Sequence, residues 1–582
     1  MKMRFVVIGL LLGLMAASGN FIVCAHPLAE GLPPVRDGDG RFGLCFIEPE
    51  EPWLSLAYDA GARVNRWQIN WRDVEHEEGN FYYGWYDPQI RAMRDRGFEI
   101  SAILTYPPDW ATEEGSVVPR NLYLPYDDPA NYWGRFVRKV VERYRGRIAS
   151  WEIWNEPDLD IYWDGTAKDY YQLLKVAYQA AKAADPACRV VMGGMGHWED
   201  PRFFERVVRL AVRDPEASAH NYFFDAVAWH WYSRPSLLYD KALWCRQVLA
   251  KYGLTKPIWV NETNVPLWGD WPGPETRQPD HATPDEQASF IIQAYANAIA
   301  ANVERVFVFR LHDAQMARGQ AYGLVRNDGS PRPAYHAYRV AATFFSHVVT
   351  ATRQISGSIT TVTMRKAHRG RVTVLWNNSP TPVTTTVAAT APAALLVDKV
   401  GRVERRRPVG GSYTITLPGA AEEGAIGGSP YILVEADDAP PTSQVEPLPA
   451  LMPDLAFPVR WSGEDDPLGL GLASYDVQVR DGDGPWRDWL VETTDTEATF
   501  VGREGHSYAF RCRARDLMGN LEPYPPDDQP DALTSLTGVL SGRVLDIRDV
   551  PVVGATVRVD GGPSATTDRQ GRFRITGLVS GT

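Results

Sequence analysis

Two glutamates stand in motifs that suit combined acid and nucleophilic chemistry. Glu156 lies between an asparagine and a proline in SWEIWNEPDLD, residues 150–160, and Glu262 lies further on in WVNETN. Two facing carboxyl groups can cleave a glycosidic bond, because the protonated group gives its proton to the leaving oxygen while the ionised group attacks the anomeric carbon. A mechanism that retains the configuration requires about 5 Å between the two groups.

Both glutamates follow short apolar runs that alternate with amphipathic helices between residues 41 and 340. The expected strands are RFGLCF, ARVNRWQI, FEISAILTY, IASWEIWN, CRVVMGG, DAVAWHWY, PIWVN and RVFVFRL. Eight such units at intervals of about 30 to 50 residues are typical of a (β/α)8 TIM barrel, whose active site lies where the strands end. A doubly wound open sheet is the alternative, but no glycine-rich phosphate loop follows the first strand. The sequence therefore predicts that both carboxylates share one face of a barrel.

Four local signals mark the expected starts of helices in this region. They are Asp128-Pro129, Asp200-Pro201, the pair Thr166 and Asp169, and the pair Thr283 and Glu286. The last two pairs have the spacing of a capping box, in which side chains and backbone amides at the first turn bond reciprocally.

Six regions of the chain, in order, resemble clan A glycoside hydrolases, and the barrel is most similar to family 39-type and family 5-type members. They are Arg66 in GARVNRWQINW, TYPPDW at 105–110, Asn155-Glu156-Pro157, His230-Trp231-Tyr232, Glu262, and YGLVRNDGSPRPAYHAY at 322–338. The resemblance implies that Glu156 is the general acid/base and Glu262 the nucleophile of a retaining double displacement. It implies no cofactor and no metal.

The neighbouring polar residues fit these roles. We expect Arg66 to hold Glu262 ionised, because a guanidinium lowers the pKa of a nearby carboxyl by about 1 to 3 units. Tyr232 is expected to donate its hydroxyl to the same carboxylate. When Glu262 becomes an ester, Glu156 loses the repulsion of its neighbour and can turn from acid to base.

Further residues are expected to contact the sugar. Asn155 would bond the 2-hydroxyl, a contact that strengthens in the transition state. His230 would touch either the sugar or Glu156. Trp110 falls in a predicted loop after a strand, where its indole face could stack on a pyranose ring; packing in the core is the alternative for Trp110.

Purely structural roles are the alternative for several of these residues. Arg66 could form only a structural salt bridge, and His230 and Tyr232 could only close the top of the barrel. Glu152 shares the strand parity of Glu156 but lies deeper, so a buried ion pair is expected. Asn261-Glu262-Thr263 matches a glycosylation sequon, which we interpret as accidental at the mouth of a barrel.

The region after residue 340 changes to period-two apolar patterns that predict β-sandwiches. We expect one sandwich over 345–436, packed on the barrel, and a second over 438–534 that resembles fibronectin type III modules in its spaced aromatics Trp461, Tyr475, Trp489 and Tyr508. Residues 535–582 are similar to the start of a carboxypeptidase-regulatory-like sandwich, which we expect to continue further. We interpret these modules as spacers or as attachment units for a cell surface or polysaccharide.

Charge and the amino-terminal segment indicate where the protein acts. The net charge of −12 excludes a nucleic-acid role, which needs a basic surface. Residues 1–25 have the pattern of a secretory signal peptide, although lipid attachment at Cys24 is an alternative. No other segment is apolar enough to span a membrane. The four remaining cysteines are scattered and are expected to be buried thiols.

The sequence thus predicts a secreted or cell-surface retaining glycoside hydrolase that cleaves a poly- or oligosaccharide. Two other hypotheses stay open. One is a non-catalytic carbohydrate-binding or adhesion protein on an inert barrel. The other is a transglycosylase, which uses the same covalent intermediate with a sugar in place of water.

Overall fold

The computed structural model describes Val35 and residues 38–313, 320–366, 370–421, 425–436, 439–465 and 471–578. The expected signal peptide, residues 1–25, lies outside these residues. Within them we find no helix with the length and hydropathy that a membrane span requires.

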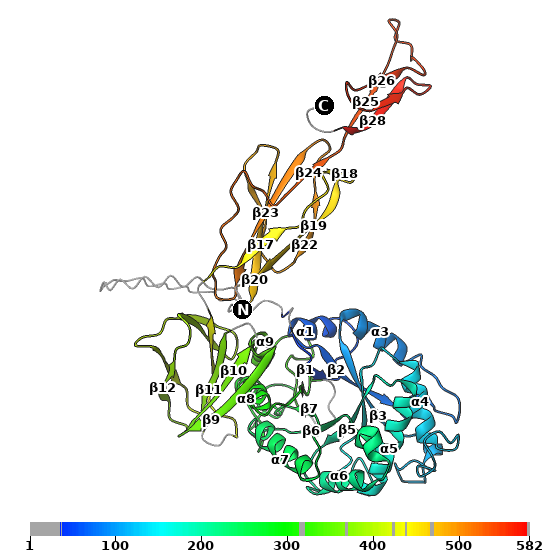
Figure 1. Ribbon diagram of the computed structural model, residues 1–582, viewed down its shortest axis with the longest axis vertical. Helices are drawn as coiled ribbons and strands as arrows, with labels where there is room; N and C mark the ends of the chain where they lie inside the picture. The colour runs from blue at the N-terminus through cyan, green and yellow to red at the C-terminus, as the bar shows by residue number, and fades with distance from the viewer. Residues whose placement is uncertain are drawn as a thin grey trace, which may run out of the picture. The chain divides into compact units, whose positions relative to one another are not determined.

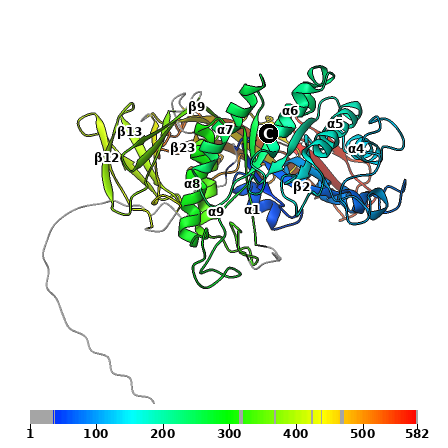
Figure 2. The ribbon, with the colours of Figure 1, turned by 90° about the horizontal axis from the view of Figure 1, so that it is seen from below.

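Eight parallel strands close into a barrel in chain order, which confirms the predicted fold class. The strands are β1 (Phe42–Cys45), β2 (Val64–Asn70), β3 (Glu99–Thr105), β4 (Ser150–Asn155), β5 (Arg189–Met195), β6 (Ala226–His230), β7 (Ile258–Thr263) and β8 (Arg305–Val308). Figures 1 and 2 show these strands surrounded by helices, as burial of a parallel sheet on both faces requires.

Helices follow most of the strands. They are α1 (Trp53–Asp59), α2 (Trp71–Val74), α3 (Tyr86–Arg96), α4 (Tyr132–Arg143), α5 (Ala167–Ala184), α6 (Phe203–Arg213), α7 (Leu237–Lys251), α8 (Pro284–Ala300) and α9 (Pro333–Phe345). The predicted capping boxes begin α5 and α8. The two Asp-Pro signals were less accurate, because α4 and α6 begin two to three residues after the prolines and α4 is capped by the Asn131 side chain.

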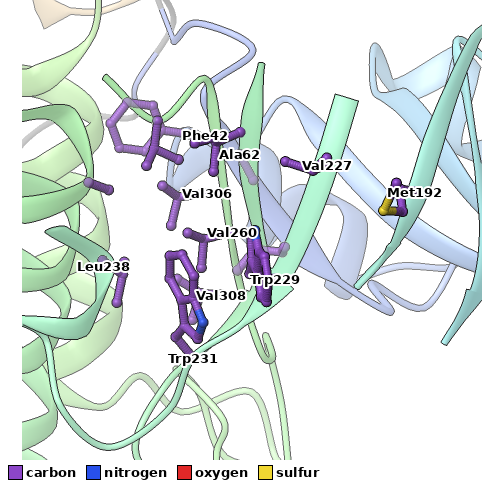
Figure 3. Close-up of a cluster of buried hydrophobic side chains, with 14 of the residues drawn as sticks. Phe42, Ala62, Met192, Val227, Trp229, Trp231, Leu238, Val260, Val306 and Val308 are labelled. Atoms are coloured by element: carbon purple, nitrogen blue, oxygen red, sulfur yellow. The ribbon is translucent and has the colours of Figure 1, made fainter. Parts of the chain in front are cut away.

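Side chains at alternate strand positions face different surroundings. Seven residues from six strands form one apolar cluster, and since the barrel is closed they must meet in its interior: Cys45, Val64, Val191, Ala226, Ala228, Trp259 and Phe307. The alternate residues, such as Trp229 and Val308, pack outward against the helices (Figure 3). The parity of β6 therefore turns His230 inward, above Ala226 and Ala228.

A β-sandwich follows the barrel. Its strands are β9 (Val348–Ser356), β10 (Ile359–Lys366), β11 (Arg371–Asn377), β12 (Val383–Ala388), β13 (Ala393–Asp398), β14 (Val403–Arg406), β15 (Ser412–Leu417) and β16 (Tyr431–Ala436). Six of them form one sheet, and the β12–β15 pair covers it. Gln293 of α8, fully buried, donates to the carbonyls of Gly427 at 2.9 Å and Gly428 at 3.0 Å. The sandwich is thereby bonded to a barrel helix.

The remaining described residues form further sheets, which are antiparallel apart from the parallel pair β18 and β24. They contain β17 (Thr442–Val445), β18 (Leu451–Met452), β19 (Ala456–Glu464), β20 (Leu472–Asp481), β21 (Arg487–Thr493), β22 (Glu497–Val501), β23 (Ser507–Asp516), β24 (Ala532–Leu536), β25 (Gly538–Arg543), β26 (Thr556–Arg558), β27 (Ser564–Thr566) and β28 (Arg572–Leu578). The sheets of β17 to β24 share one core that includes Trp461 and Tyr475. The resemblance to fibronectin type III modules stays a prediction.

Candidate active site

Arg66 lies at the centre of the polar cluster inside the barrel. It is the third residue of β2, within the expected strand ARVNRWQI. Its side chain is fully buried, and its guanidinium reaches two glutamates. Nε and Nη2 donate to the carboxylate of Glu152 at 2.8 and 2.9 Å, and Nη1 donates to Glu262 at 2.5 Å. A guanidinium, with five donors in a fixed plane, is suited to hold two carboxylates at once.

Glu152 has a structural role inside the barrel. Its side chain is only 1% exposed and is paired bidentately with Arg66. One of its oxygens also accepts the backbone N–H of Gly194 at 2.9 Å. The predicted buried ion pair is confirmed, and Glu152 fixes the plane of Arg66.

Glu262 receives two strong donors. It lies within β7, rather than after it as expected, and is paired with His230 of β6 across a local irregularity of the ladder. Besides Arg66, the Tyr232 hydroxyl donates to its other oxygen at 2.5 Å. Burial raises the pKa of Glu262, but His230, Arg66 and the Tyr232 hydrogen bond more than offset this effect, so the pKa lies below its usual range. The site thus keeps Glu262 ionised.

His230 connects the two predicted catalytic carboxylates. Its ring is fully buried, and Nδ1 lies 2.8 Å from an oxygen of Glu156 and 3.4 Å from an oxygen of Glu262. Burial lowers the pKa of His230, but the two carboxylates raise it above its usual value. Because both oxygens contact one nitrogen, they lie no more than about 6 Å apart, which is below the separation of about 6.5 to 9.5 Å in inverting glycosidases.

The backbone at Glu156 adopts an unusual conformation. Its φ of 45° lies in the left-handed region, which non-glycine residues rarely occupy. The Glu156 N–H donates to the carbonyl of Gly194 at 2.8 Å, which holds this turn against β5. Strain of this kind persists only where the surroundings fix it, and it is concentrated at functional sites.

Gly194 leaves the space that His230 occupies. A Cβ atom at position 194 would lie 2.1 Å from Nε2 of His230 and 2.7 Å from Oδ1 of Asn261. These separations are far below van der Waals contact, and both neighbours are buried. The sequence does not indicate this role, because a glycine in the run VVMGGM carries no sign of the side chain that faces it from the next strand.

We expect Gly194→Ala to displace His230. Overpacking of this size costs about 1 to 3 kcal/mol in free energy of unfolding, and the displaced ring should lose its contact with Glu156. Denaturant unfolding checks the cost, and NMR titration of His230 checks the contact through a pKa shifted towards the ordinary value. Gly40→Ala, at a position with only one neighbour within 4 Å, is the control. An unchanged His230 titration would contradict the packing argument.

The structure brings most, but not all, of the predicted site residues together. Asn155 joins the cluster, since its Oδ1 accepts from Arg66 at 3.1 Å. Trp110 instead donates its indole N–H to the backbone carbonyl of Glu75 and packs against Trp71 and Tyr132. These contacts fit the alternative of a packing role, and stacking of Trp110 on a sugar stays a prediction.

The burial of Asn261 tests whether the sequon could carry a glycan. Its side chain is 1% exposed, so the Asn261-Glu262-Thr263 match cannot be reached by a bulky glycan in the folded chain. The interpretation that the match is accidental is supported.

Aromatic residues beside Glu262 line a cavity that the sequence analysis did not identify. The ring of Phe309, which follows β8, packs edge-to-face against those of Tyr232 and Phe46. The distances between ring centroids are 6.1 Å and 6.0 Å. The cavity has a volume of about 360 Å³ and is lined by Phe46, Glu48, Trp67, Gln68, Phe309 and Arg310. Its walls come from the ends of β1, β2 and β8, so it opens next to the carboxylate cluster.

The closed parallel barrel thus carries one glutamate just after β4 and another at the end of β7, and His230 contacts both. Residues 115–390 match the family model described as glycosyl hydrolases family 39. A family 39 glycoside hydrolase from the gut symbiont Bacteroides cellulosilyticus WH2 has a similar solved structure, with a TM-score of 0.54 and 19% identity over 69% of this chain and 81% of that chain. The likeness shows a shared fold.

Two β-xylosidases are similar in sequence. The enzyme of Caldicellulosiruptor saccharolyticus is 28% identical over 238 residues, which cover 36% of this chain and 46% of the relative. That of Geobacillus stearothermophilus is 28% identical over 121 residues, which cover 19% of this chain and 23% of the relative. The matched part of the chain spans less than half the length of either relative.

Proposed function

We propose that the protein is a retaining glycoside hydrolase that cleaves β-glycosidic bonds of a poly- or oligosaccharide by double displacement. The observation that carries this proposal is the contact of His230 with both Glu156 and Glu262, which keeps an oxygen of each carboxyl group within about 6 Å of the other, below the separation of about 6.5 to 9.5 Å in inverting enzymes. In the first step Glu262 attacks the anomeric carbon, and Glu156 protonates the leaving oxygen. In the second step Glu156 takes a proton from water, which cleaves the glycosyl ester.

The electrostatics support a division of labour between the two glutamates. Glu262 is bonded by Arg66 and Tyr232, which stabilise its ionised form. In the described part of the chain Glu156 contacts neither of these donors, and its side chain bonds His230 at 2.8 Å. A histidine can exchange a proton with a carboxyl at this distance, so Glu156 is suited to proton transfer and Glu262 to attack.

We predict that Tyr232→Phe moves the acid limb of the pH–activity profile to higher pH. Glu262 must be ionised to attack, and its lowered pKa lets it stay ionised below the pH at which an ordinary glutamate is protonated. Loss of the Tyr232 hydrogen bond raises this pKa, so activity is lost earlier as the pH falls. The measurement is kcat/KM against pH. Tyr322→Phe is the control, since Tyr322 packs on Tyr232 without a hydrogen bond to Glu262; equal shifts in both variants would contradict the assignment.

We predict that Glu156→Ala slows hydrolysis according to the leaving group. Proton donation contributes about 10²- to 10⁴-fold to such a step, so glycosides with poor leaving groups should lose this factor. A dinitrophenyl leaving group departs without a proton, so formation of the glycosyl ester on Glu262 should persist. Added azide, which needs no general base, should restore the second step by attacking this ester in place of water. Asp160→Asn, an exposed change on the same loop, is the control. Equal losses with good and poor leaving groups would refute the acid role.

The substrate and the place of action are part of the proposal. Since two similar proteins are β-xylosidases, aryl β-xylosides are the first substrates to test. The signal-peptide pattern of residues 1–25 supports secretion. A secreted enzyme would meet the polysaccharides of cell walls and matrices. Turnover of aryl β-glycosides by the purified protein tests the activity itself.

A further inference from the structure

The cavity of about 360 Å³ is formed at the ends of β8, β1 and β2, whereas Glu156 follows β4. In the closed ring, β8 stands across from β4, and β1 and β2 lie between them on the side away from β5 to β7. Glu156 must contact the oxygen of the leaving group, and the anomeric carbon must face Glu262. The ring that carries the anomeric carbon therefore extends away from Glu156, into this cavity.

Arg310 is a poorly satisfied guanidinium in the cavity wall. Its side chain is 12% exposed, and the one hydrogen bond it makes among the described residues runs from Nη2 to the carbonyl of Phe46 at 3.5 Å, the outer limit of such a bond. The buried Nε has no partner in the described part of the chain. Arg66 and Arg332, which are fully buried, differ from Arg310 because each bonds two carboxylates. Arg310 thus retains donors for a ligand.

Glu48 faces Arg310 without a hydrogen bond. Its Oε1 lies 3.9 Å from Nη2 of Arg310 and 3.7 Å from Nε2 of His312, and the side chain is 43% exposed. At these distances the carboxylate balances the charge of Arg310 without accepting a hydrogen bond from Arg310 or His312. Burial and Arg310 lower the pKa of His312, so this ring is neutral and adds no charge. The polar wall is therefore close to neutral overall and offers both donors and acceptors.

The rest of the wall is aromatic. Phe46, Trp67 and Phe309 line the same cavity as the two charged groups. A pyranose ring has apolar faces and an edge of hydroxyl groups, each of which can donate and accept. An aromatic wall beside a separated donor and acceptor matches these two kinds of surface.

We infer that Glu48 and Arg310 form a clamp that binds vicinal hydroxyl groups of a neutral sugar, and that this cavity is the glycone subsite. The inference rests on the proposed function and names the side of the cleft and the class of sugar. Arg310 donates to one hydroxyl and Glu48 accepts from its neighbour. A sugar that carries a carboxylate is disfavoured, because Glu48 already balances Arg310 and would repel a second negative charge.

A thermodynamic cycle between side chain and hydroxyl tests the clamp. We compare kcat/KM of the parent protein and Arg310→Met for 4-nitrophenyl β-xyloside and its 3-deoxy and 4-deoxy analogues. Removal of the bonded hydroxyl should cost the parent about 10- to 100-fold, as for hydrogen bonds to charged groups, and Arg310→Met should lose a similar factor with the xyloside. The deoxy sugar should lose almost nothing more in Arg310→Met. If the fold-losses in kcat/KM from Arg310→Met and from hydroxyl removal multiplied for both deoxy analogues, the clamp would be overturned.

The class of sugar is tested by charge. Glu48→Gln leaves Arg310 unbalanced, so the ratio of kcat/KM for 4-nitrophenyl β-glucuronide over β-glucoside should rise about tenfold. Glu50→Gln removes the same charge from an exposed neighbouring position and should leave the ratio unchanged. A parent protein that prefers the glucuronide, or an unchanged ratio in Glu48→Gln, would overturn the assignment to neutral sugars.

A binding measurement separates failure of the subsite from failure of the proposed function. Calorimetry of xylose and its deoxy analogues with Glu262→Gln, with and without Arg310→Met, needs no catalysis. The same non-additive pattern in binding would support the clamp even if no glycoside were hydrolysed. Turnover by the parent protein together with equal binding of xylose and both deoxy sugars would refute the clamp and leave the hydrolase in place. Absence of both turnover and sugar binding would refute both.

Discussion

Glu262→Gln is expected to lower kcat with every glycoside by about 10⁴-fold or more, because the amide cannot attack the anomeric carbon. The substitution keeps the size of the side chain and an oxygen that can accept from Arg66 or Tyr232. Arg66 also keeps its bidentate partner Glu152, so the barrel should remain folded. Steady-state rates and a thermal unfolding curve, measured on the same preparation, separate lost chemistry from lost structure.

Glu275→Gln is the matched control for this variant. Glu275 is an exposed residue of the same connection between β7 and α8, and its substitution should change neither rate nor stability. Activity within tenfold of the parent protein in Glu262→Gln would contradict the assignment of the nucleophile.

Arg66→Met is expected to destabilise the protein by about 3 to 5 kcal/mol, the usual cost of removing one member of a buried ion pair. Two glutamates would then lie in the barrel without their cation, since Arg66 bonds both Glu152 and Glu262. The pKa of Glu262 should rise as well, because Arg66 is one of the groups that lower it. Denaturant unfolding gives the change in stability, and the dependence of kcat/KM on pH gives the change in the pKa of Glu262.

A double variant separates the structural from the catalytic part of this effect. Arg66→Met combined with Glu152→Leu removes the unpaired buried charge at position 152 and should recover much of the stability. Activity should stay low, because Glu262 still lacks its guanidinium. Arg120→Met removes an exposed arginine that pairs with Glu113 and should cost less than about 1 kcal/mol. Recovery of both stability and activity in the double variant would mean that Arg66 acts only through Glu152.

The barrel and the two carboxylates were accessible from sequence because they depend on local patterns. Each apolar run has the length of a strand, and the capping boxes at Thr166 and Thr283 fix where two helices begin. The order of strands in a parallel barrel follows the chain, so residues at strand ends must meet on one face. Glu156, Glu262 and His230 could therefore be placed together before any coordinates were known.

Other features depend on contacts between strands that a single sequence does not encode locally. Arg66 lies within the expected strand, but nothing in that strand indicates that its long side chain bonds Glu152 of β4 as well as Glu262 of β7. The need for glycine at position 194 arises from the ring of His230 on the next strand. The contacts of Trp110 with Trp71 and Tyr132 likewise follow from packing above the barrel, which composition does not reveal.

The exposed tryptophans of the loops show the same limit. Trp271, in the connection after β7, is 83% exposed, while the carbonyl of the same residue is held by the buried Arg332. Nothing in the sequence around Trp271 indicates that the backbone there is anchored. An anchored loop can present its side chain in one position, which an apolar platform for a sugar would require.

Trapping of the covalent intermediate tests the central claim most directly. The protein is incubated with a 2-deoxy-2-fluoro β-xyloside that carries a dinitrophenyl leaving group, and the product is digested and analysed by mass spectrometry. The account predicts one fluoroglycosyl group per chain, attached to the peptide that contains Glu262, and no labelling of Glu262→Gln. A label on Glu156 or on another residue, or turnover of the parent xyloside by a protein that forms no adduct, would contradict the double displacement at Glu262.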